Sequence, residues 1–328
     1  MVERLSDVAV VAIGRNEGDR LKACLRSVVD TAVLVVYVDS GSTDDSVAFA
    51  RSLSVDVIQI DMSVPFTAAR ARNAGWRRVR ALAPKVGLVQ FVDGDCVVAE
   101  DWLRTAANFL STQANAASVC GRRRERFPER SIYNQLCDIE WDAPAGETKA
   151  CGGDVMTRMA ALEAVGGYRE ACIAGEEPEL CVRLRAAGWR IWRLADEMTV
   201  HDAAMTRLSQ WWKRSMRTGY TYAEGAHLHG APPERHKVSE ARSAWLWGLC
   251  LPAALLAGAV VAGPWVLWAF AVYPLQMLRL FLRASHPVKA RAWWAFFIVI
   301  GKFAEVTGQL KYLALRWSGR RAHLIEYK

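Results

Sequence analysis

Residues 86–95 read VGLVQFVDGD. The first seven are nearly all apolar, and such a run is typical of a β-strand that is buried on both faces. Asp93 and Asp95 follow at once, separated by one glycine. Two carboxylates on a tight turn can point the same way, which suits a divalent cation that takes oxygen ligands and keeps positions for phosphate oxygens. The alternative is that Asp-Gly only turns the chain after the strand.

Similar apolar runs precede this strand at regular intervals. They are residues 7–13 (DVAVVAI), 33–38 (VLVVYV) and 55–60 (VDVIQI). We expect helices between the strands: over residues 18–29, from Ser42 as N-cap with Asp45 at N3 to about residue 53, and around residues 68–75. Strands that alternate with helices predict an α/β fold with a parallel sheet covered by helices.

Acidic residues follow the strands at their carboxyl ends, where such sheets bind ligands. Asp39 follows the second strand, and Asp93 and Asp95 follow the fourth. No G-x-G-x-x-G follows the first strand, where residues 14–17 read GRNE, and the chain contains no G-x-x-x-x-G-K-[ST]. A dinucleotide oxidoreductase and a P-loop phosphotransferase are therefore disfavoured.

A second group of polar residues follows further along the chain. Residues 151–156 read CGGDVM, and residues 175–180, GEEPEL, open a predicted helix. Glu176, Glu177 and Glu179 fall in the first turn of that helix. One of them can act as a partner of the helix dipole. Crowded carboxylates also raise one another's pKa, which suits a general base.

Taken in order, six motifs of this chain resemble the family-2 glycosyltransferases of the GT-A fold, over about the first two-thirds of the sequence. They are Asn-Glu after the first strand, VDSGSTD (38–44), ARNAG (71–75), DGD (93–95), GGD with VGGY (152–168) and GEEPELCVRLRAAG (175–188). The resemblance implies an enzyme of the bacterial surface-polysaccharide type. Such an enzyme transfers a sugar, with inversion, from a UDP- or GDP-linked nucleoside-diphosphate sugar, assisted by Mg²⁺ or Mn²⁺.

The resemblance also assigns residues to a donor site. Asn16 and Glu17 belong to it by their place after the first strand. By position, Asp39 would hydrogen-bond the nucleoside, Arg72 would face the donor pyrophosphate, and Asp93 would lie near the ribose.

Metal and catalytic residues follow from the same resemblance. Asp95 would be the main metal contact, and Glu177 matches the catalytic carboxylate. Glu176 could share that role, because this chain has Glu-Glu where the family usually has Glu-Asp. His201 falls where many of these enzymes carry a metal-binding histidine; the alternative is an ordinary hydrogen-bonded surface residue. Asp154 either binds the acceptor or only caps the following helix.

The chemistry of the transfer is consistent with these roles. Breaking a sugar–phosphate bond leaves a diphosphate whose growing negative charge needs a metal, arginine or lysine. Inversion needs one carboxylate that takes the proton of the acceptor hydroxyl. Asp95 and Glu177 can meet these two needs.

A basic segment follows the second group of polar residues. Residues 210–214 read QWWKR and depart from the Gln-x-x-Arg-Trp of processive members, which argues against a polysaccharide synthase. Arg214 and Arg217 could bind the donor diphosphate. The alternative is a basic amphipathic helix on anionic lipid, and both can hold at once.

The arginine-rich run 122–126, RRRER, raises the question of nucleic acid. No nucleic-acid-binding motif accompanies this run, so we expect no nucleic-acid partner. A solvated face, or a site for a phosphate-bearing lipid acceptor, is the expectation.

Composition divides the chain into two parts. Of 328 residues, 42 are Lys or Arg and 34 are Asp or Glu, and 52% are hydrophobic, which excludes a disordered protein. Residues 243–278 contain no charge at all. We therefore expect a catalytic domain at 1–230, a basic linker at 231–242 and membrane-associated helices at 243–328.

The uncharged stretch suits two membrane-spanning helices, at about 244–261 and 265–281, separated by Ala-Gly-Pro. A buried hairpin in a soluble domain is disfavoured, since neither helix has a polar face. Basic residues flank both ends, which places both ends in the cytoplasm. A third apolar segment, 293–317, contains Lys302, Glu305 and Lys311 and predicts an interfacial or re-entrant helix.

These features predict an enzyme of the inner membrane that faces the cytoplasm. Eight cysteines without a C-x-x-C pair fit a reducing compartment, and the first residues do not read as a signal peptide. An anchored transferase suggests a polyprenyl-linked or glycan acceptor beside the membrane lipids. The alternative is a non-catalytic membrane-bound scaffold that keeps the fold.

Overall fold

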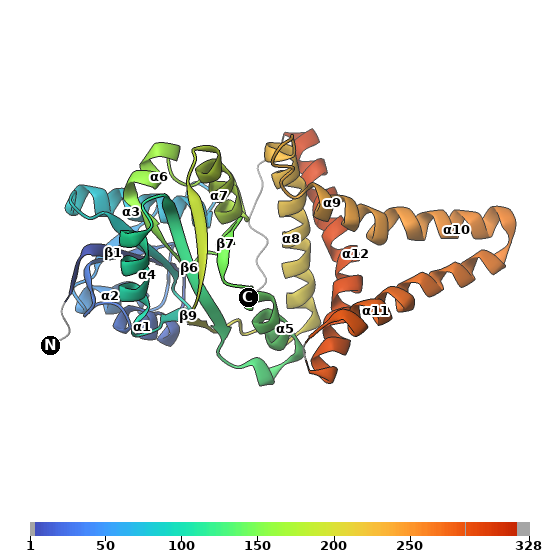
Figure 1. The fold of residues 1–328 in the computed structure, drawn as a ribbon, viewed down its shortest axis with the longest axis horizontal. Coiled ribbons are helices and arrows are strands. Elements are labelled where there is room, and N and C mark those ends of the chain that lie inside the picture. The colour runs from blue at the N-terminus through green and yellow to red at the C-terminus, as the bar shows by residue number, and fades with distance from the viewer. Residues whose placement is uncertain (1–3, 286, 320–328) are drawn as a thin grey trace. The chain divides into compact units, whose positions relative to one another are not determined.

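The computed structural model describes residues 4–285 and 287–319, and the chain divides into two compact units (Figure 1). The first unit comprises Met1–Phe127 and Asp138–Ala203, and the second comprises Pro128–Cys137 and Ala204–Lys328. The domain limits expected at residues 230 and 242 stay predictions.

The first unit is built on one mixed sheet of nine strands. Eight of them follow the order β3-β2-β1-β4-β8-β6-β9-β5, and β7 (Gly146–Thr148) pairs with β9. The parallel half consists of β1 (Leu5–Gly14), β2 (Ala32–Asp39), β3 (Asp56–Gln59) and β4 (Leu88–Asp93). These are the four strands expected from the sequence. Their register places Asp39 beside Gly14 and Asp93 beside Ile13, so the acidic ends of β2 and β4 flank the end of β1.

The other half of the sheet brings distant segments together. It consists of β8 (Val155–Arg158), β6 (Ala116–Glu125), β9 (Arg190–His201) and β5 (Cys96–Val98). β8 runs antiparallel to β4 and β6, whereas β6 and β9 are parallel. In this register His201 lies beside Glu125 on one side and Cys96 on the other. The sheet is therefore mixed, where the sequence predicted a parallel one.

Helices pack against the sheet. They are α1 (Asp19–Arg26), α2 (Ser46–Ser52), α3 (Ala68–Leu82), α4 (Trp102–Thr112), α6 (Met159–Val165) and α7 (Glu176–Ala186). A Cβ at Gly75 of α3 would come 2.2 Å from the Val11 side chain, so a glycine lets α3 pack closely on β1. A short 3₁₀ turn, Pro128–Arg130, precedes α5 (Ile132–Trp141), which spans the limit between the units.

The prediction of Ser42 as a helix N-cap is wrong. α2 begins at Ser46, after Asp45, and the Ser46 N–H donates to the Asp44 carboxylate at 3.0 Å. The Ser42 hydroxyl instead accepts a hydrogen bond from the Asn16 N–H, 2.9 Å away. Ser42 thus links two loops at the end of the sheet, a contact that local spacing does not reveal.

The second unit is helical. It contains α8 (Leu208–His229), α9 (Val238–Trp245), a π-helical turn (Leu246–Cys250), α10 (Leu251–Ala262), a 3₁₀ segment (Pro264–Ala271), α11 (Val272–Arg283) and α12 (Val288–Ser318). α8 and α12 approach closely, because a Cβ at Gly308 of α12 would come 1.9 Å from the Met216 carbonyl oxygen.

Two continuous helical stretches of this unit, Val238–Ala262 and Pro264–Arg283, are long and apolar enough to cross a membrane. Few of their side chains are buried within the protein, unlike those of a soluble core helix. Gly263, at φ +105°, makes the turn between them. The prediction of two apolar helices is confirmed, with both extending beyond the expected limits. The segment 293–317 forms part of α12, and its interfacial or re-entrant placement stays a prediction.

Candidate active site

The Asp39 carboxylate at the end of β2 is fully buried and held by the chain itself. It accepts hydrogen bonds from the N–H groups of Gly41 and Ser42, each at 3.1 Å. The Tyr37 hydroxyl donates a third, also at 3.1 Å. Burial raises the pKa of Tyr37, so this donor keeps its proton. These hydrogen bonds therefore fix the orientation of the Asp39 carboxylate.

Asn16 joins the β1–α1 loop to the β2–α2 loop. It adopts φ +56°, and its side-chain oxygen accepts a hydrogen bond from the Thr43 N–H at 2.7 Å. Asn16 is thus a loop-to-loop brace beside Asp39. Its neighbour Glu17 forms an ion pair with Arg20 at 2.7 Å.

Arg72 of α3 is the centre of a buried charge cluster. Its Nη1 lies 2.7 Å from Glu176 Oε1 and 3.2 Å from Glu177 Oε1. Its Nη2 donates to Asp93 Oδ1 at 2.9 Å. Only 2% of the arginine is exposed. Burial opposes its charge, but the three carboxylates outweigh this effect and raise the pKa of Arg72. The structure thus brings together one predicted donor arginine, one predicted donor carboxylate and both predicted catalytic carboxylates.

The surroundings of Glu177 in this cluster change its pKa. Burial, and then the negative charge of Glu176, raise its pKa to about 7, although Arg72 acts in the opposite direction. A carboxylate with such a pKa is near the optimum for a general base at neutral pH. Glu179 belongs to a different cluster, since it pairs with Arg169 and Arg183.

The backbone at Gly153 lies directly against the Arg72 cluster. A Cβ there would come 2.3 Å from Arg72 Nη2, 3.0 Å from Glu177 Oε1 and 3.1 Å from Asp93 Oδ2. A Cβ at the preceding Gly152 would meet nothing within 4 Å. The Gly-Gly-Asp motif therefore contains one glycine that the charge cluster requires.

Asp154 is fully buried and holds Arg123 and the end of β4. Its carboxylate accepts from Arg123 Nε at 3.0 Å, from the Asp93 N–H at 3.0 Å and from the Thr199 hydroxyl at 2.7 Å. Burial alone would raise its pKa, but Arg123 and these hydrogen bonds outweigh burial and lower it. Asp154 precedes β8 and caps no helix, so the capping alternative is wrong.

Arg123 is a site residue that sequence reasoning missed. Besides Asp154, its Nη2 contacts Asp93 Oδ2 at 3.4 Å. Arg122 and Arg124, its neighbours along β6, pair with other carboxylates, on Asp138, Asp142 and Glu197. The run is therefore neither a uniform solvated face nor a free phosphate site. The register of β6 is irregular around Arg122, so the alternation of a regular strand does not separate Arg123 from its neighbours.

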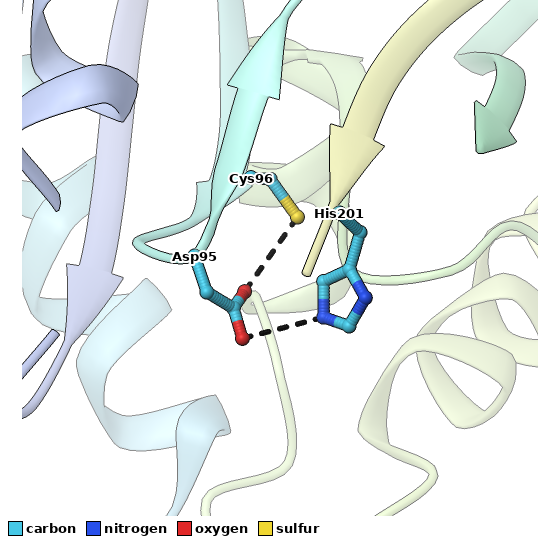
Figure 2. A group of neighbouring side chains, drawn as sticks. All are labelled: Asp95, Cys96 and His201. Carbon is cyan, nitrogen blue, oxygen red and sulfur yellow. Dashed lines mark hydrogen bonds and ion pairs between the residues drawn. The ribbon is translucent and has the colours of Figure 1, made fainter. Parts of the chain in front are cut away.

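Asp95, Cys96 and His201 form the candidate metal site (Figure 2). His201 Nε2 lies 3.3 Å from Asp95 Oδ2, and both residues are buried. Two atoms that bind one cation at 2.0–2.2 Å lie roughly 3 Å apart, so the pair fits a divalent cation. The Cys96 thiol lies 3.6 Å from Asp95 Oδ1. Burial, and then the charge of Asp154, raise its pKa well above the usual value, so the thiol stays protonated and donates to Asp95.

A second grouping, Asp93, Cys96 and Asp154, is less suited to a cation. Both of its carboxylates already contact Arg123, whose positive charge opposes a metal ion at the same oxygens. Asp95 with His201 is thus the better donor pair. The predicted metal residues lie together, and the alternative of His201 as a surface residue is wrong, since only 6% of it is exposed.

Aromatic and acidic side chains surround His201. Trp141 meets the imidazole edge to face, with ring centres 4.9 Å apart, and lies 5.4 Å from the Arg123 guanidinium. Glu125 Oε2 lies 3.9 Å from His201 Nδ1. Sequence reasoning found neither Trp141 nor Glu125, because both come from segments without a recognised motif.

Five of the predicted residues of the first unit are thus linked by side-chain contacts and one short turn of the backbone. Glu177 touches Arg72, Arg72 touches Asp93, and Asp93 is two residues from Asp95, which touches His201. Arg214 and Arg217 lie on α8 in the second unit, and their contact with a diphosphate stays a prediction.

Comparisons of sequence give one family. Residues 9–153 match the family model "Glycosyl transferase family 2". The succinoglycan biosynthesis protein ExoA of Rhizobium meliloti (strain 1021) is 25% identical over 193 residues. These residues cover 54% of this chain and 57% of that protein, so the similarity spans little more than half of the relative's length.

Comparisons of structure give the fold. The mannosyltransferase PcManGT from Pyrobaculum calidifontis, solved in complex with GDP-Man and Mn²⁺, has a TM-score of 0.62 and 21% identity, over 95% of this chain and 89% of that one. A mycobacterial protein has a TM-score of 0.50 and 19% identity, over 69% of this chain and 75% of that one. The fold is GT-A, and residues 9–153, which contain Asp39, Arg72 and the Asp93–Asp95 turn, match the model of glycosyl transferase family 2.

Proposed function

We propose that this protein is a metal-dependent, inverting glycosyltransferase. It moves a sugar from a UDP- or GDP-linked donor to a polyprenyl-linked or glycan acceptor at the cytoplasmic face of the inner membrane. The observation that carries the proposal is the Arg72 cluster, in which a base with a pKa of about 7 lies in one chain of contacts with the Asp95–His201 pair.

Asp95 and His201 would hold the cation. When bound, Mg²⁺ or Mn²⁺ supplies positive charge that stabilises the leaving diphosphate. Mg²⁺ strongly prefers oxygen ligands and retains its water, so the imidazole nitrogen of His201 favours Mn²⁺ of the two. PcManGT, which has the same fold, was solved with Mn²⁺ and GDP-Man, and this is consistent with the choice.

Glu177 acts as the general base. Its carboxylate takes the proton of the acceptor hydroxyl while that oxygen forms a bond to the anomeric carbon. The bond from this carbon to the diphosphate oxygen breaks on the opposite face, and the electron pair leaves with the nucleoside diphosphate. Arg72 holds Glu177 in position, and Glu176, almost fully buried, keeps Arg72 paired when Glu177 becomes neutral.

The donor rests against the loops at the carboxyl ends of β1, β2 and β4. Asp39, fixed by its three hydrogen bonds, would bind the nucleoside, with Asn16 and Glu17 in the neighbouring loop. Asp93 would lie near the ribose. The carboxylate oxygens of Asp154 accept hydrogen bonds from Arg123 and the Asp93 N–H. Asp154 would therefore affect the acceptor only indirectly, through these two residues.

The second unit supports an acceptor in the membrane. Two apolar helices with exposed side chains fit a membrane anchor, and basic residues flank the two ends of the uncharged stretch. An anchored enzyme is best placed to act on an acceptor that is itself in the bilayer. The similarity to a protein named for succinoglycan biosynthesis agrees with a surface polysaccharide.

The test is sugar transfer by membranes that contain the full chain. We expect label from a panel of radioactive UDP- and GDP-sugars to enter a butanol-soluble lipid fraction in the presence of Mn²⁺. Asp95→Ala should abolish this transfer. Asp142→Ala is the control and should not, because it removes an exposed carboxylate that pairs with Arg122. A scaffold would still complement its deletion strain with Asp95→Ala, and label only in water-soluble product would contradict the lipid acceptor.

A further inference from the structure

Glu125 is a buried carboxylate without a role in the proposed reaction. It ends β6, directly beside His201 of β9 in the sheet register. Its Oε1 accepts a hydrogen bond from the Phe127 N–H at 3.1 Å, and its Oε2 accepts one from the Ala203 N–H at 3.0 Å. The side chain is completely shielded from solvent. Two backbone groups thus fix this carboxylate at a constant place next to the imidazole.

The two nitrogens of His201 face different carboxylates. Nε2 lies 3.3 Å from Asp95, the predicted metal contact, and Nδ1 lies 3.9 Å from Glu125 Oε2. Nδ1 is buried and has no hydrogen-bond partner among residues 4–285 and 287–319. Leaving a buried polar group unpaired is costly, and Glu125 is an acceptor within reach of a small shift of the ring. Trp141 packs on the ring and limits other orientations.

We propose that Glu125 positions His201 for metal binding, by holding the proton on Nδ1 so that the lone pair of Nε2 points toward Asp95. The inference rests on the metal site of the proposed function and adds a residue to it. In metal sites of this kind the second ring nitrogen donates to a carboxylate, which fixes the tautomer and increases the basicity of the ligand. Glu125 touches neither sugar nor cation, so it is a positioning residue.

Manganese binding tests this role apart from catalysis. The experiment uses three full-length proteins purified in detergent: wild type, Glu125→Gln and Glu197→Gln. Each is titrated with Mn²⁺, with and without GDP or UDP. Electron paramagnetic resonance measures the free Mn²⁺. We expect Glu125→Gln, which keeps the size of the side chain, to bind Mn²⁺ at least tenfold more weakly. Glu197→Gln removes an exposed carboxylate of β9 that pairs with Arg124, and should bind like wild type.

Each outcome separates the two proposals. Wild type that binds no Mn²⁺ contradicts the metal site itself. Wild type and Glu125→Gln that bind Mn²⁺ equally well contradict only the role of Glu125.

The tautomer of His201 gives a readout that needs no metal. In ¹⁵N-histidine spectra, with the His201 signal assigned by its loss in His201→Gln, the shares of Nδ1–H and Nε2–H are compared between variants, because Asp95, 3.3 Å from Nε2, competes with Glu125 for the proton when no metal is bound. Glu125→Gln should carry a measurably smaller share of the proton on Nδ1 than wild type. Equal shares in wild type and Glu125→Gln would overturn the proposal.

Discussion

Arg72 shows how a single side chain can organise a site. Its guanidinium is shared by carboxylates from α7 and from the end of β4, and the Tyr168 ring lies 5.7 Å away. Burial is the largest cause of the raised pKa of Glu177, and the negative charges of Glu176 and Asp93 add to it while Arg72 opposes them. The raised pKa of Glu177 is therefore a product of its surroundings, which the motif alone does not specify.

The pH dependence of transfer should report Glu177. A base must be ionised, and burial and Glu176 raise its pKa to about 7, so kcat/KM should fall tenfold per pH unit below pH 7 and level off above it. Glu177→Gln should lower kcat by roughly 10²–10⁴-fold and remove this dependence. The measurement is kcat/KM between pH 5.5 and 8.5, with Glu197→Gln as control. A value of kcat/KM that stays constant down to pH 5.5 would contradict a base with the raised pKa of Glu177.

Gly153→Ala tests the packing of the cluster. The added methyl group would come 2.3 Å from Arg72 Nη2, so the arginine or the loop must move, and we expect transfer to fall at least tenfold while the protein remains folded. Gly152→Ala is the matched control, because its methyl group meets nothing within 4 Å. Equal activity of the two variants would mean that the cluster tolerates displacement.

At the scale of elements, local patterns predicted most of the parallel half of the sheet. β1 to β4 are mostly apolar runs. Short apolar runs of this kind are typical of strands that are buried on both faces of a sheet. The half formed by β5 to β9 was not predicted. Its strands carry many charged residues, as β6 does over 122–125, and their pairing is fixed by contacts between distant segments.

In the candidate site, too, the residues on the parallel half of the sheet were predicted and those on the other half were mostly missed. Asp39, Asp93 and Asp95 follow predictable strands, so sequence placed them at one edge of the sheet. Arg123 and Glu125 lie on β6. Arg123 pairs with Asp154, which is 31 positions away, and Glu125 accepts a hydrogen bond from Ala203, which is 78 positions away. No local spacing carries that information, whereas the sheet register gives it directly.

The contact between α8 and α12 depends on glycine. A Cβ at Gly308 would come 1.9 Å from the Met216 carbonyl oxygen, which is backbone and cannot rotate away. We expect Gly308→Ala to destabilise the second unit by about 1–3 kcal/mol, the usual cost of overpacking. Gly301→Ala, on the same helix, is the control, since its nearest neighbour would be the Trp211 ring at an ordinary 3.6 Å. Thermal unfolding in detergent should show a lower midpoint for Gly308→Ala only.

At the scale of the whole molecule, the chain joins a GT-A fold to a helical unit with two apolar helices. Many apolar side chains of the two apolar helices are exposed, for example those of Val260 and Val261 near the turn. Contact of so much apolar surface with water is unfavourable. The charge-free stretch ends in basic residues on both sides. If both helices cross the bilayer, the turn at Gly263 lies on the face opposite to the loop that precedes α9.

Cysteine labelling can determine this arrangement, because seven of the eight native cysteines are buried and only Cys250 is exposed. In a Cys250→Ser background, Val261→Cys marks the turn and Ala231→Cys marks the loop before α9. With a membrane-impermeant maleimide on spheroplasts, we expect Val261→Cys to be labelled in intact cells and Ala231→Cys only after permeabilisation. This pattern would place the first unit, which is joined to that loop through α8, in the cytoplasm, where the proposed function requires it. Labelling of both positions only after permeabilisation would instead mean that the hairpin lies on the cytoplasmic surface without crossing.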